Sequence, residues 1–527
     1  MQQDFKQSDM RVARVLSEGG RVSVQQMALL LEAARAAGLT HMRVDARQSL
    51  IFNHGALPTR VGQLHLFAQH LADVGLRCAY EHEQNIVSSV PSVQVFAHNS
   101  WVDSGVYGVL LRELHEVGVG MGSRDADEAP AFPLSVSLVD GRQHFVPHLS
   151  SELNFVASDT EDYWYVYIRY GQADQAAVLW PFLVGSPCLA QFAYSLAHDL
   201  AAGVEVSVCA GQYAQDARWQ MIALEQAVAQ PYSAVPRYEG FIPYGHNQYA
   251  LGIVRADQSF EVLMLEYMLK LMQQQDLVEL YTTPWGSLLI KGIHEAHIPV
   301  WNRLLCLQHC DVGLSYGQLN WLILADEANH ADGVRLRNHL AQQLQDNGLR
   351  TWGLGFAIVD EASHAHQSWP TSIIVRVQRD SSWFGWRKRV RYALWCIPAD
   401  QSLAQQYHCI AEGLDLHELV GELTDRVIKH QKSIGVSRQK AMVAPLTMPT
   451  HWATIGQAVQ SPSFAVQNTV KAEIFVCRHC ATEYHEDLGE PSQNIAAHTP
   501  FAQLNEQFHC PVCEHGKSAF EPLLRSA

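Results

Sequence analysis

Charged residues are scarce in this chain, and acidic residues outnumber basic ones. They make up 17% of the 527 residues, against 48% hydrophobic residues, and the formal net charge is −16. An acidic balance argues against nucleic acid and against anionic membrane surfaces as partners. The apolar content is ample for large cores, and a chain of this length is expected to form roughly three or four domains.

The chain also lacks a stretch that we interpret as a membrane span. The most apolar of its long uncharged stretches, residues 175–198, contains Pro181, Gly185 and Pro187. Because these residues interrupt a helix, we predict a buried helix–turn–helix there and no membrane insertion. Residues 1–6 lack the basic and apolar regions of a signal peptide.

A disulfide framework is missing as well. Seven cysteines are scattered through the body of the chain without regular spacing: Cys78, Cys188, Cys209, Cys306, Cys310, Cys396 and Cys409. Small disulfide-stapled domains carry an even and compact set, so scattered thiols are typical of a reduced compartment. We therefore predict a cytoplasmic protein.

The other four cysteines form two Cys-x-x-Cys motifs near the C-terminus. Cys477 and Cys480 make the first motif, and after twenty-nine residues Cys510 and Cys513 make the second. Each motif turns its two thiolates inward, and the connection between them is long enough to bring the second pair back to complete a tetrahedron. Four thiolates suit iron or zinc, and geometry alone does not choose between the two metals.

The residues around these motifs resemble the rubredoxin family. The resemblance covers residues 472–524 and implies one iron ion that is held by the four cysteines and passes one electron. The matching residues, besides the cysteines, are Phe475, Tyr484, Gly489, Glu490, Pro491, Thr499, Pro500, Phe501, Lys517 and Phe520.

Three positions depart from the rubredoxin pattern. Ala481 and Glu514 stand where glycine usually follows each motif, and Phe508 replaces a tryptophan. Glycine lets a backbone N–H approach the cysteine sulfur, so these changes are expected to shift the redox potential. The alternative to rubredoxin is a zinc ribbon that only stabilises the C-terminus.

The body of the chain contains a two-fold repeat. Residues 21–55 and 259–293 correspond at a constant offset of 238 residues, each with a short strand, an apolar helix and a further strand. The helical positions Met27, Leu30 and Leu31 match Leu265, Met268 and Leu269. A period this long indicates duplicated domains.

A mixed segment follows each repeat. In the first we predict a helix at about 103–117 and strands at 134–139, 155–157 and 164–169; in the second, strands at 319–324, 352–359 and 372–377 and a helix at 331–347. Residues 438–470 have several prolines and little periodicity, which is typical of a linker. The pattern is α+β, and it is repeated.

This organisation resembles the siroheme-dependent nitrite and sulfite reductases over residues 15–430. The resemblance rests on the run Gly20–Gly38, on Arg47 and Gln48, and on the segments 85–87 and 153–157. It implies an α+β fold class with a duplicated ferredoxin-like half-domain, each copy followed by an α+β domain, and a small rubredoxin-like four-cysteine domain at the end. The implied boundaries are 15–80, 81–240, 241–310, 311–437, a linker at 438–470, and 471–527.

The resemblance fails at the residues that those reductases need for six-electron reduction. Segments 319–324 and 355–363 stand where two cysteine pairs should hold a four-iron cluster, and neither contains cysteine. Segment 131–137 stands where a basic strand is expected and has no lysine or arginine. Cys306 and Cys310 lie on a predicted helix, 298–310, where core packing is the simpler interpretation. We expect no four-iron cluster in the body.

Arg47 and Gln48 remain as candidates for binding siroheme. Arg47 resembles an arginine that contacts siroheme in those reductases, and Gln48 lies beside it. The alternative is an arginine that is solvated or salt-bridged at the edge of the half-domain. The sequence leaves both interpretations open.

We interpret the chain as an electron carrier, with a working rubredoxin on a degenerate reductase-like scaffold. The expected partners are a reductase that donates electrons and a true nitrite or sulfite reductase that accepts them, in inorganic nitrogen or sulfur assimilation. One alternative is an enzyme whose body binds siroheme and reduces nitrite, fed by its own rubredoxin. Another is a structural zinc-ribbon protein.

Overall fold

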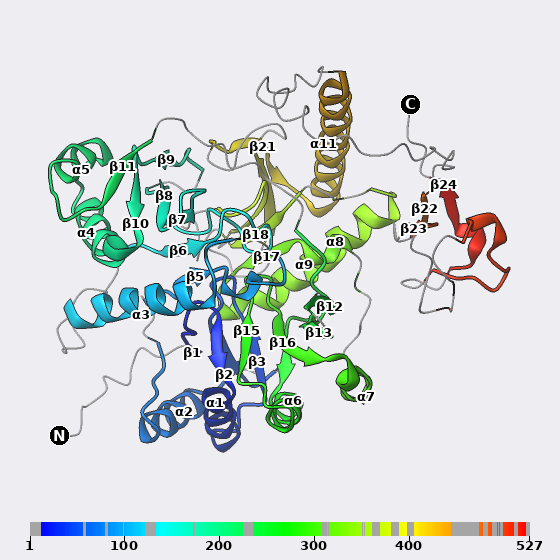
Figure 1. The fold of residues 1–527 in the computed structure, drawn as a ribbon, viewed down its shortest axis with the longest axis horizontal. Helices are drawn as coiled ribbons and strands as arrows, with labels where there is room; N and C mark the ends of the chain where they lie inside the picture. The colour runs from blue at the N-terminus through cyan, green and yellow to red at the C-terminus, as the bar shows by residue number, and fades with distance from the viewer. Residues whose placement is uncertain are drawn as a thin grey trace, which may run out of the picture. The chain divides into compact units, whose positions relative to one another are not determined.

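The computed structural model divides into two compact units, Met1–Ser433 and Ile434–Ala527 (Figure 1). It describes residues 12–55, 59–79, 83–97, 100–121, 133–171, 174–224, 235–245, 247–307, 314, 316–349, 351, 354–360, 369–380, 389–397, 405–443, 474–477, 483–486, 493, 495, 499–510 and 515–522. Within this part of the chain, no helix is both long and apolar enough to cross a membrane.

The predicted repeat is confirmed at its predicted offset. Helix α1 spans Val24–Ala36 and α6 spans Val262–Gln274, while strand β3 spans His41–Val44 and β15 spans Glu279–Thr282. The helical positions expected to face the core are buried in both copies. Each element of the first copy therefore has its counterpart 238 residues further along the chain.

The two copies exchange one strand each. Strand β14 of the second copy pairs with β3 of the first, and β2 of the first copy pairs with β15 of the second. Both sheets are antiparallel. In spatial order the first contains β1 (Ala13–Val15), β4 (Leu50–Asn53), β3 and β14 (Phe260–Glu261). The second contains β12 (Gly240–Gly245), β13 (Gln248–Ile253), β16 (Leu288–His294), β15 and β2 (Arg21–Ser23).

Helices cover these two sheets on one side. In Figure 1, α1, α6 and α2 (Val61–Asp73) lie together below the strands, and α1 packs against both of the others. Side chains from both copies form one continuous core there, which includes Met27, Leu30, Met268 and Leu269. Because the core and the strands are shared, neither copy is a self-contained half-domain.

A reciprocal exchange of glutamine and glycine lies inside this repeat. Gln48 and Gly286 occupy equivalent turns with φ of 65° and 68°, and Gly20 and Gln258 are likewise equivalent. A Cβ atom on Gly20 would lie 2.5 Å from Nε2 of Gln48, and one on Gly286 would lie 2.8 Å from the Gln258 amide. Each pair of turns therefore has space for one glutamine side chain. In the first copy the glutamine is at the second turn, as Gln48, and in the second copy it is at the first turn, as Gln258.

The mixed domains that follow are also related to each other. In both sheets two parallel pairings come first; three antiparallel pairings follow along the first sheet and two along the second. The first sheet contains β5 (Val87–Ser88), β6 (Val136–Val139), β7 (Leu153–Ala157), β8 (Tyr163–Ile168), β9 (Val178–Leu179), β10 (Phe182–Gly185) and β11 (Met221–Ala223); the second contains β17 (Trp321–Leu324), β18 (Phe356–Asp360), β19 (Ile373–Asp380), β20 (Arg389–Cys396) and β21 (His408–Leu414).

Each of these sheets has helices packed on one face. Helices α3 (Ser104–Met121), α4 (Leu189–Ala201) and α5 (Val206–Tyr213) contribute to the core of the first, and α9 (Glu327–Asp346) and α11 (Leu416–Val443) to that of the second. Two further helices, α7 and α8, span Ile298–Leu307 and Tyr316–Leu319. A mixed α/β fold with several sheets results.

Two predicted segments differ from the structure in their local conformation. Residues 175–198 are not a helix–turn–helix, because β9 and β10 occupy the first half and α4 begins only at Leu189. A short apolar run between prolines fits a strand as well as a helix. The predicted linker, 438–470, begins inside α11, and residues 444–470 lie outside the described residues.

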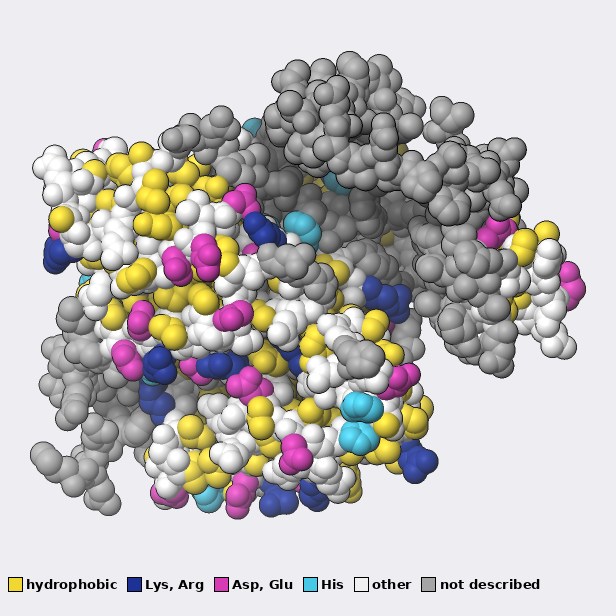
Figure 2. Space-filling model, viewed as in Figure 1, with side chains coloured by type: hydrophobic (Ala, Val, Ile, Leu, Met, Phe, Trp, Pro, Cys, Tyr) yellow, Lys and Arg dark blue, Asp and Glu magenta, His cyan; other side chains and the backbone are white. Residues whose placement is uncertain are grey.

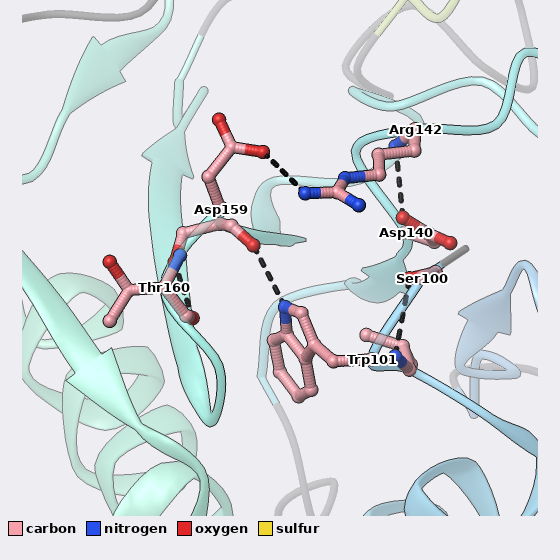
Figure 3. Close-up of polar contacts among 8 residues, drawn as sticks. Ser100, Trp101, Asp140, Arg142, Asp159 and Thr160 are labelled. Carbon is pink, nitrogen blue, oxygen red and sulfur yellow. Dashed lines mark hydrogen bonds and ion pairs between the residues drawn. The ribbon is translucent and has the colours of Figure 1, made fainter. Parts of the chain in front are cut away.

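The carboxyl ends of the parallel strands carry carboxylates in both mixed domains. Asp140 follows β6 and Asp360 ends β18, and both are almost fully buried. The guanidinium of Arg379 lies 2.7 Å from the Asp360 carboxylate. In the first domain the position of Arg379 is taken by Asp159, and Arg142 turns toward Asp159 at 3.0 Å (Figure 3). Oδ2 of Asp140 has no hydrogen-bond partner among the described residues.

Candidate metal centre

The C-terminal unit builds its metal site on a three-stranded sheet. Strand β22 (Ile474–Cys477) lies between β23 (Glu483–His485) and β24 (Phe520–Pro522). Cys477 is the last residue of β22 and pairs across the sheet with Phe520. The first cysteine of the motif is therefore placed by regular backbone hydrogen bonding.

An aromatic cluster fills the inside of this unit. The rings of Phe475 and Phe501 stack with centroids 4.1 Å apart, and Tyr484, Phe508 and Phe520 pack around Phe501 at 5.7–6.0 Å. Phe508, which stands where rubredoxins usually have tryptophan, is almost fully buried. The smaller ring therefore still serves as a core residue.

Cys477 and Cys510 both lie within this buried cluster. Neither side chain is exposed to solvent. The backbone N–H of Cys510 donates to the carbonyl of His515 at 2.8 Å, which fixes the start of the second motif. Cys480 and Cys513 lie outside the described residues.

Polar contacts hold the connection between the two motifs. The Tyr484 hydroxyl donates to the carbonyl of Thr499 at 2.7 Å, and the Glu486 carboxylate accepts from the N–H of Phe501 at 2.8 Å. The Lys517 ammonium donates to the carbonyl of Leu504 at 2.5 Å. Tyr484, Phe501 and Lys517 are residues that the sequence pattern singled out, and each of them anchors this connection.

Gln493 is a residue that sequence reasoning missed. Its side-chain Nε2 donates to the carbonyl of His509 at 2.7 Å, and its Oε1 accepts from the N–H of the same residue at 3.2 Å. The side chain thus engages both backbone groups of the residue directly before Cys510. A single glutamine carries no periodic or spacing signal from which this role could be read.

Comparison with known proteins decides the identity of this unit. The rubredoxin family profile matches residues 474–520. Over 44 residues the chain is 50% identical to the "Probable Rubredoxin-2" of Methanocaldococcus jannaschii. This match covers 8% of the present chain and 80% of the relative. The C-terminal segment belongs to the rubredoxin family.

A longer relative is also named as a type of rubredoxin. The "Anaerobic nitric oxide reductase flavorubredoxin" of Pectobacterium atrosepticum is 32% identical over 117 residues. This match covers 22% of the present chain and spans 23% of the relative's length.

The body is similar in fold to a solved structure, that of the NirA protein of Mycobacterium tuberculosis. The TM-score is 0.55 at 14% sequence identity, and the match covers 78% of each chain. An identity this low concerns the fold alone. At that level the predicted resemblance of the body to the nitrite and sulfite reductases is confirmed.

A rubredoxin domain implies an iron site of four cysteines, and the described residues fit it. Cys477 and Cys510 supply two thiols that are withdrawn from water in one apolar cluster, and thiolates are the soft ligands that iron accepts. Cys480 and Cys513 would supply the other two. A bound iron ion would hold one electron at a time.

Arg47, the first siroheme candidate, is surrounded by protein acceptors. Its Nε and Nη2 donate to the carbonyl of Asn85 at 3.1 and 2.6 Å, and Nη2 also donates to the carbonyl of Val136 at 3.2 Å. Nη1 donates to the Ser151 hydroxyl at 3.2 Å. Burial lowers the pKa of Arg47 to about 10, against the opposing effect of Asp45, so the side chain remains charged at neutral pH.

Gln48 is engaged in the same way. Its Nε2 donates to the carbonyls of Ser88 and Thr282 at 3.0 and 3.1 Å, and its Oε1 accepts from the N–H of Ser88 at 2.8 Å. Gln48 thereby joins the first repeat, the first mixed domain and the second repeat. Its side chain is fully buried and acts as a junction between these three parts.

A small cavity lies beside Arg47. It is also lined by Ser135, Ser150, Leu322 and Pro370 and has a volume of about 20 Å³. This volume admits a single water molecule, whereas ligand sites typically measure roughly 300–1,000 Å³. As they stand, Arg47 and Gln48 do not fit a siroheme carboxylate, because their donors already serve the protein; their assignment to siroheme stays a prediction.

Three further cysteines of the body lie on α7 and on the paired strands β20 and β21. Cys306 is exposed on α7, Cys396 is buried on β20 and Cys409 is exposed on β21, while Cys310 lies outside the described residues. No group of three or more Cys, His, Asp and Glu side chains that could hold a metal occurs among the described residues. Cys480 and Cys513 are not among those residues.

Proposed function

We propose that the chain is an electron-transfer protein in which the rubredoxin domain is the redox centre. The observation that carries the proposal is the burial of Cys477 and Cys510 in one aromatic cluster, within a segment that matches the rubredoxin family. Burial in an apolar, close-packed site limits solvent access and thereby tunes the potential of an iron–thiolate centre.

The body serves as a docking scaffold in this proposal. The hydrogen-bonded surroundings of Arg47 and Gln48 support a structural role for both residues. The face of the body in Figure 2 carries acidic, basic and apolar side chains interspersed with one another, which suits contact with another soluble protein. The proposed electron donor is a reductase, and the proposed acceptor is a nitrite or sulfite reductase in inorganic nitrogen or sulfur assimilation.

Metal and sulfide analysis of anaerobically purified full-length protein tests this function. We expect one iron and no acid-labile sulfide per chain, with visible thiolate-to-iron bands that bleach on one-electron reduction. A colourless protein that holds only zinc after expression with iron would refute electron transfer. About five irons with four sulfides would indicate a rubredoxin site plus one four-iron cluster in the body.

The ligand assignment is tested by Cys510→Ser. Serine exchanges a soft sulfur ligand for a hard oxygen, so the visible bands should be lost or strongly shifted. Cys306→Ser, at an exposed cysteine of α7, is the matched control and should keep the bands and the iron content of the wild type. Equal spectra for the two variants would exclude Cys510 as a ligand.

A further inference from the structure

The backbone before the second cysteine motif is held from two sides. On one side, His509 forms a bridge with Gly516, and the N–H of Cys510 donates to the carbonyl of His515 at 2.8 Å. On the other side lies the amide of Gln493, with its donor and its acceptor on the two backbone groups of His509. The Gln493 amide thus makes with His509 the pair of hydrogen bonds that the backbone of a neighbouring strand would otherwise make.

We propose that Gln493 positions the second cysteine motif and so controls how firmly the rubredoxin site holds its metal. Cys510 is the next residue after His509, so a displacement of the His509 backbone moves the Cys510 thiolate directly. The neighbour on the other side, Phe508, is packed against Tyr484 and Phe520 with ring centroids 5.5 and 5.3 Å away. Packing therefore fixes residue 508, and Gln493 fixes residue 509.

This inference rests on the proposed metal site and deepens it. Groups that orient metal ligands without touching the metal typically contribute 10- to 100-fold to metal affinity. The two hydrogen bonds of Gln493 require an amide, because one is donated and the other accepted. A carboxylate of the same size would keep the acceptor, lose the donor and face the His509 carbonyl with a negative charge.

The experiment compares Gln493→Glu with Gln503→Glu in the full-length protein. The Gln493 variant is isosteric, so packing is preserved while the hydrogen bond from Nε2 is removed. Gln503 is an exposed residue of the same domain, and its variant makes the same change of charge. The readouts are the rate of zinc release to a chelator, the reduction potential of the iron form, and hydrogen exchange followed by mass spectrometry.

We expect Gln493→Glu to release zinc at least 10-fold faster than Gln503→Glu, with a displaced potential and faster exchange in the peptide that contains His509. Peptides from β22 and β24 should keep their protection. The proposal is overturned if the two variants match in release rate and potential. It is also overturned if exchange rises equally over β22 and β24, since Gln493 would then support the fold as a whole.

The zinc measurement keeps this inference separate from the proposed function. If the natural protein held zinc alone, electron transfer would fail, and the comparison of zinc release would still decide the role of Gln493. If the iron form proved redox-active and the two variants released zinc equally, the function would stand and the positioning role would be rejected.

Discussion

Lys291 shows how one partly buried residue gives the body a dependence on pH. Its ammonium on β16 donates to the carbonyls of Val90 and Val93 at 3.0 Å each and lies 4.3 Å from the centre of the Tyr281 ring. Burial lowers the pKa of Lys291 to about 7, against the opposing effect of Glu279. The residue links the second repeat to the first mixed domain, so its protonation bears on that junction.

The sign of this effect is fixed by the direction of the pKa shift. Between pH 7 and the ordinary lysine value of 10.5 the unfolded chain binds more protons than the folded one, so stability rises with pH in this window. The free energy of unfolding of the wild type should rise relative to that of Lys291→Met by up to about 1 kcal/mol per pH unit. Denaturant unfolding at pH 6–9, followed by tryptophan fluorescence, measures it. Parallel pH profiles would contradict the assigned pKa.

Asp360 and Asp140 give a matched pair of variants: the Asp360 carboxylate pairs with the guanidinium of Arg379 at 2.7 Å, whereas Oδ1 of Asp140 accepts from the backbone N–H of Arg142 at 2.9 Å. Asp360→Asn breaks a largely buried ion pair and leaves Arg379 with the more distant carboxylate of Asp332, at 3.8 Å, which should cost about 2 kcal/mol. Asp140→Asn neutralises a buried carboxylate whose Oδ2 has no partner among the described residues, so it should be close to neutral. Thermal unfolding compares them, and an equal loss in both variants would count against this account.

At the scale of elements, the exchange of glutamine and glycine between the two repeats can be reversed experimentally. Gly286→Gln alone should destabilise the body by about 2 kcal/mol, because its side chain meets Gln258. Gln258→Gly alone removes the hydrogen bond from Nε2 to the carbonyl of Trp285. The double variant recreates the arrangement of Gly20 and Gln48, whose φ of 65° shows that glutamine is tolerated in this turn.

The double variant should therefore cost at least about 1 kcal/mol less than the sum of the two single variants. Denaturant unfolding of the three variants and the wild type gives the four corners of the cycle. Strict additivity would show that the two positions do not compete for the same space.

The elements differ in how far sequence alone could predict them. Helices α1 and α6 were predictable because an apolar stripe at helical spacing occurs twice at one offset. The exchange of β2 and β14 was not, because the alternation of a short strand shows which face is buried and not which strand lies beside it. Strands β9 and β10 were predicted as helix because a short apolar run fits either structure.

The candidate site shows the same division. Cys477, Cys480, Cys510 and Cys513 were predictable from spacing, since the chemistry of a metal requires ligands at set intervals. Gln493 was not predictable, because its role depends on the fold that brings its side chain to His509. For Arg47 two interpretations were open, and only the structure shows that its donors are engaged by carbonyls and a hydroxyl.

At the scale of the whole molecule, the division into two units makes the rubredoxin domain separable from the body. The boundary falls at Ser433 and Ile434, and the aromatic cluster around Cys477 and Cys510 consists only of residues from the second unit. A domain of this size depends on its metal for much of its stability. The metal-loaded rubredoxin should therefore survive when it is cut from the body.

Limited proteolysis of the iron-loaded protein should cut between Ala444 and Thr469, where prolines and serines interrupt any periodic pattern. The fragment 471–527 should keep the visible iron bands and the potential of the full-length protein. Removal of the metal before digestion should instead lead to degradation of the fragment, because the two cysteine motifs are then no longer joined. A chain that resists cleavage throughout this segment, or a fragment that loses its iron on release, would show that the body helps to hold the redox centre.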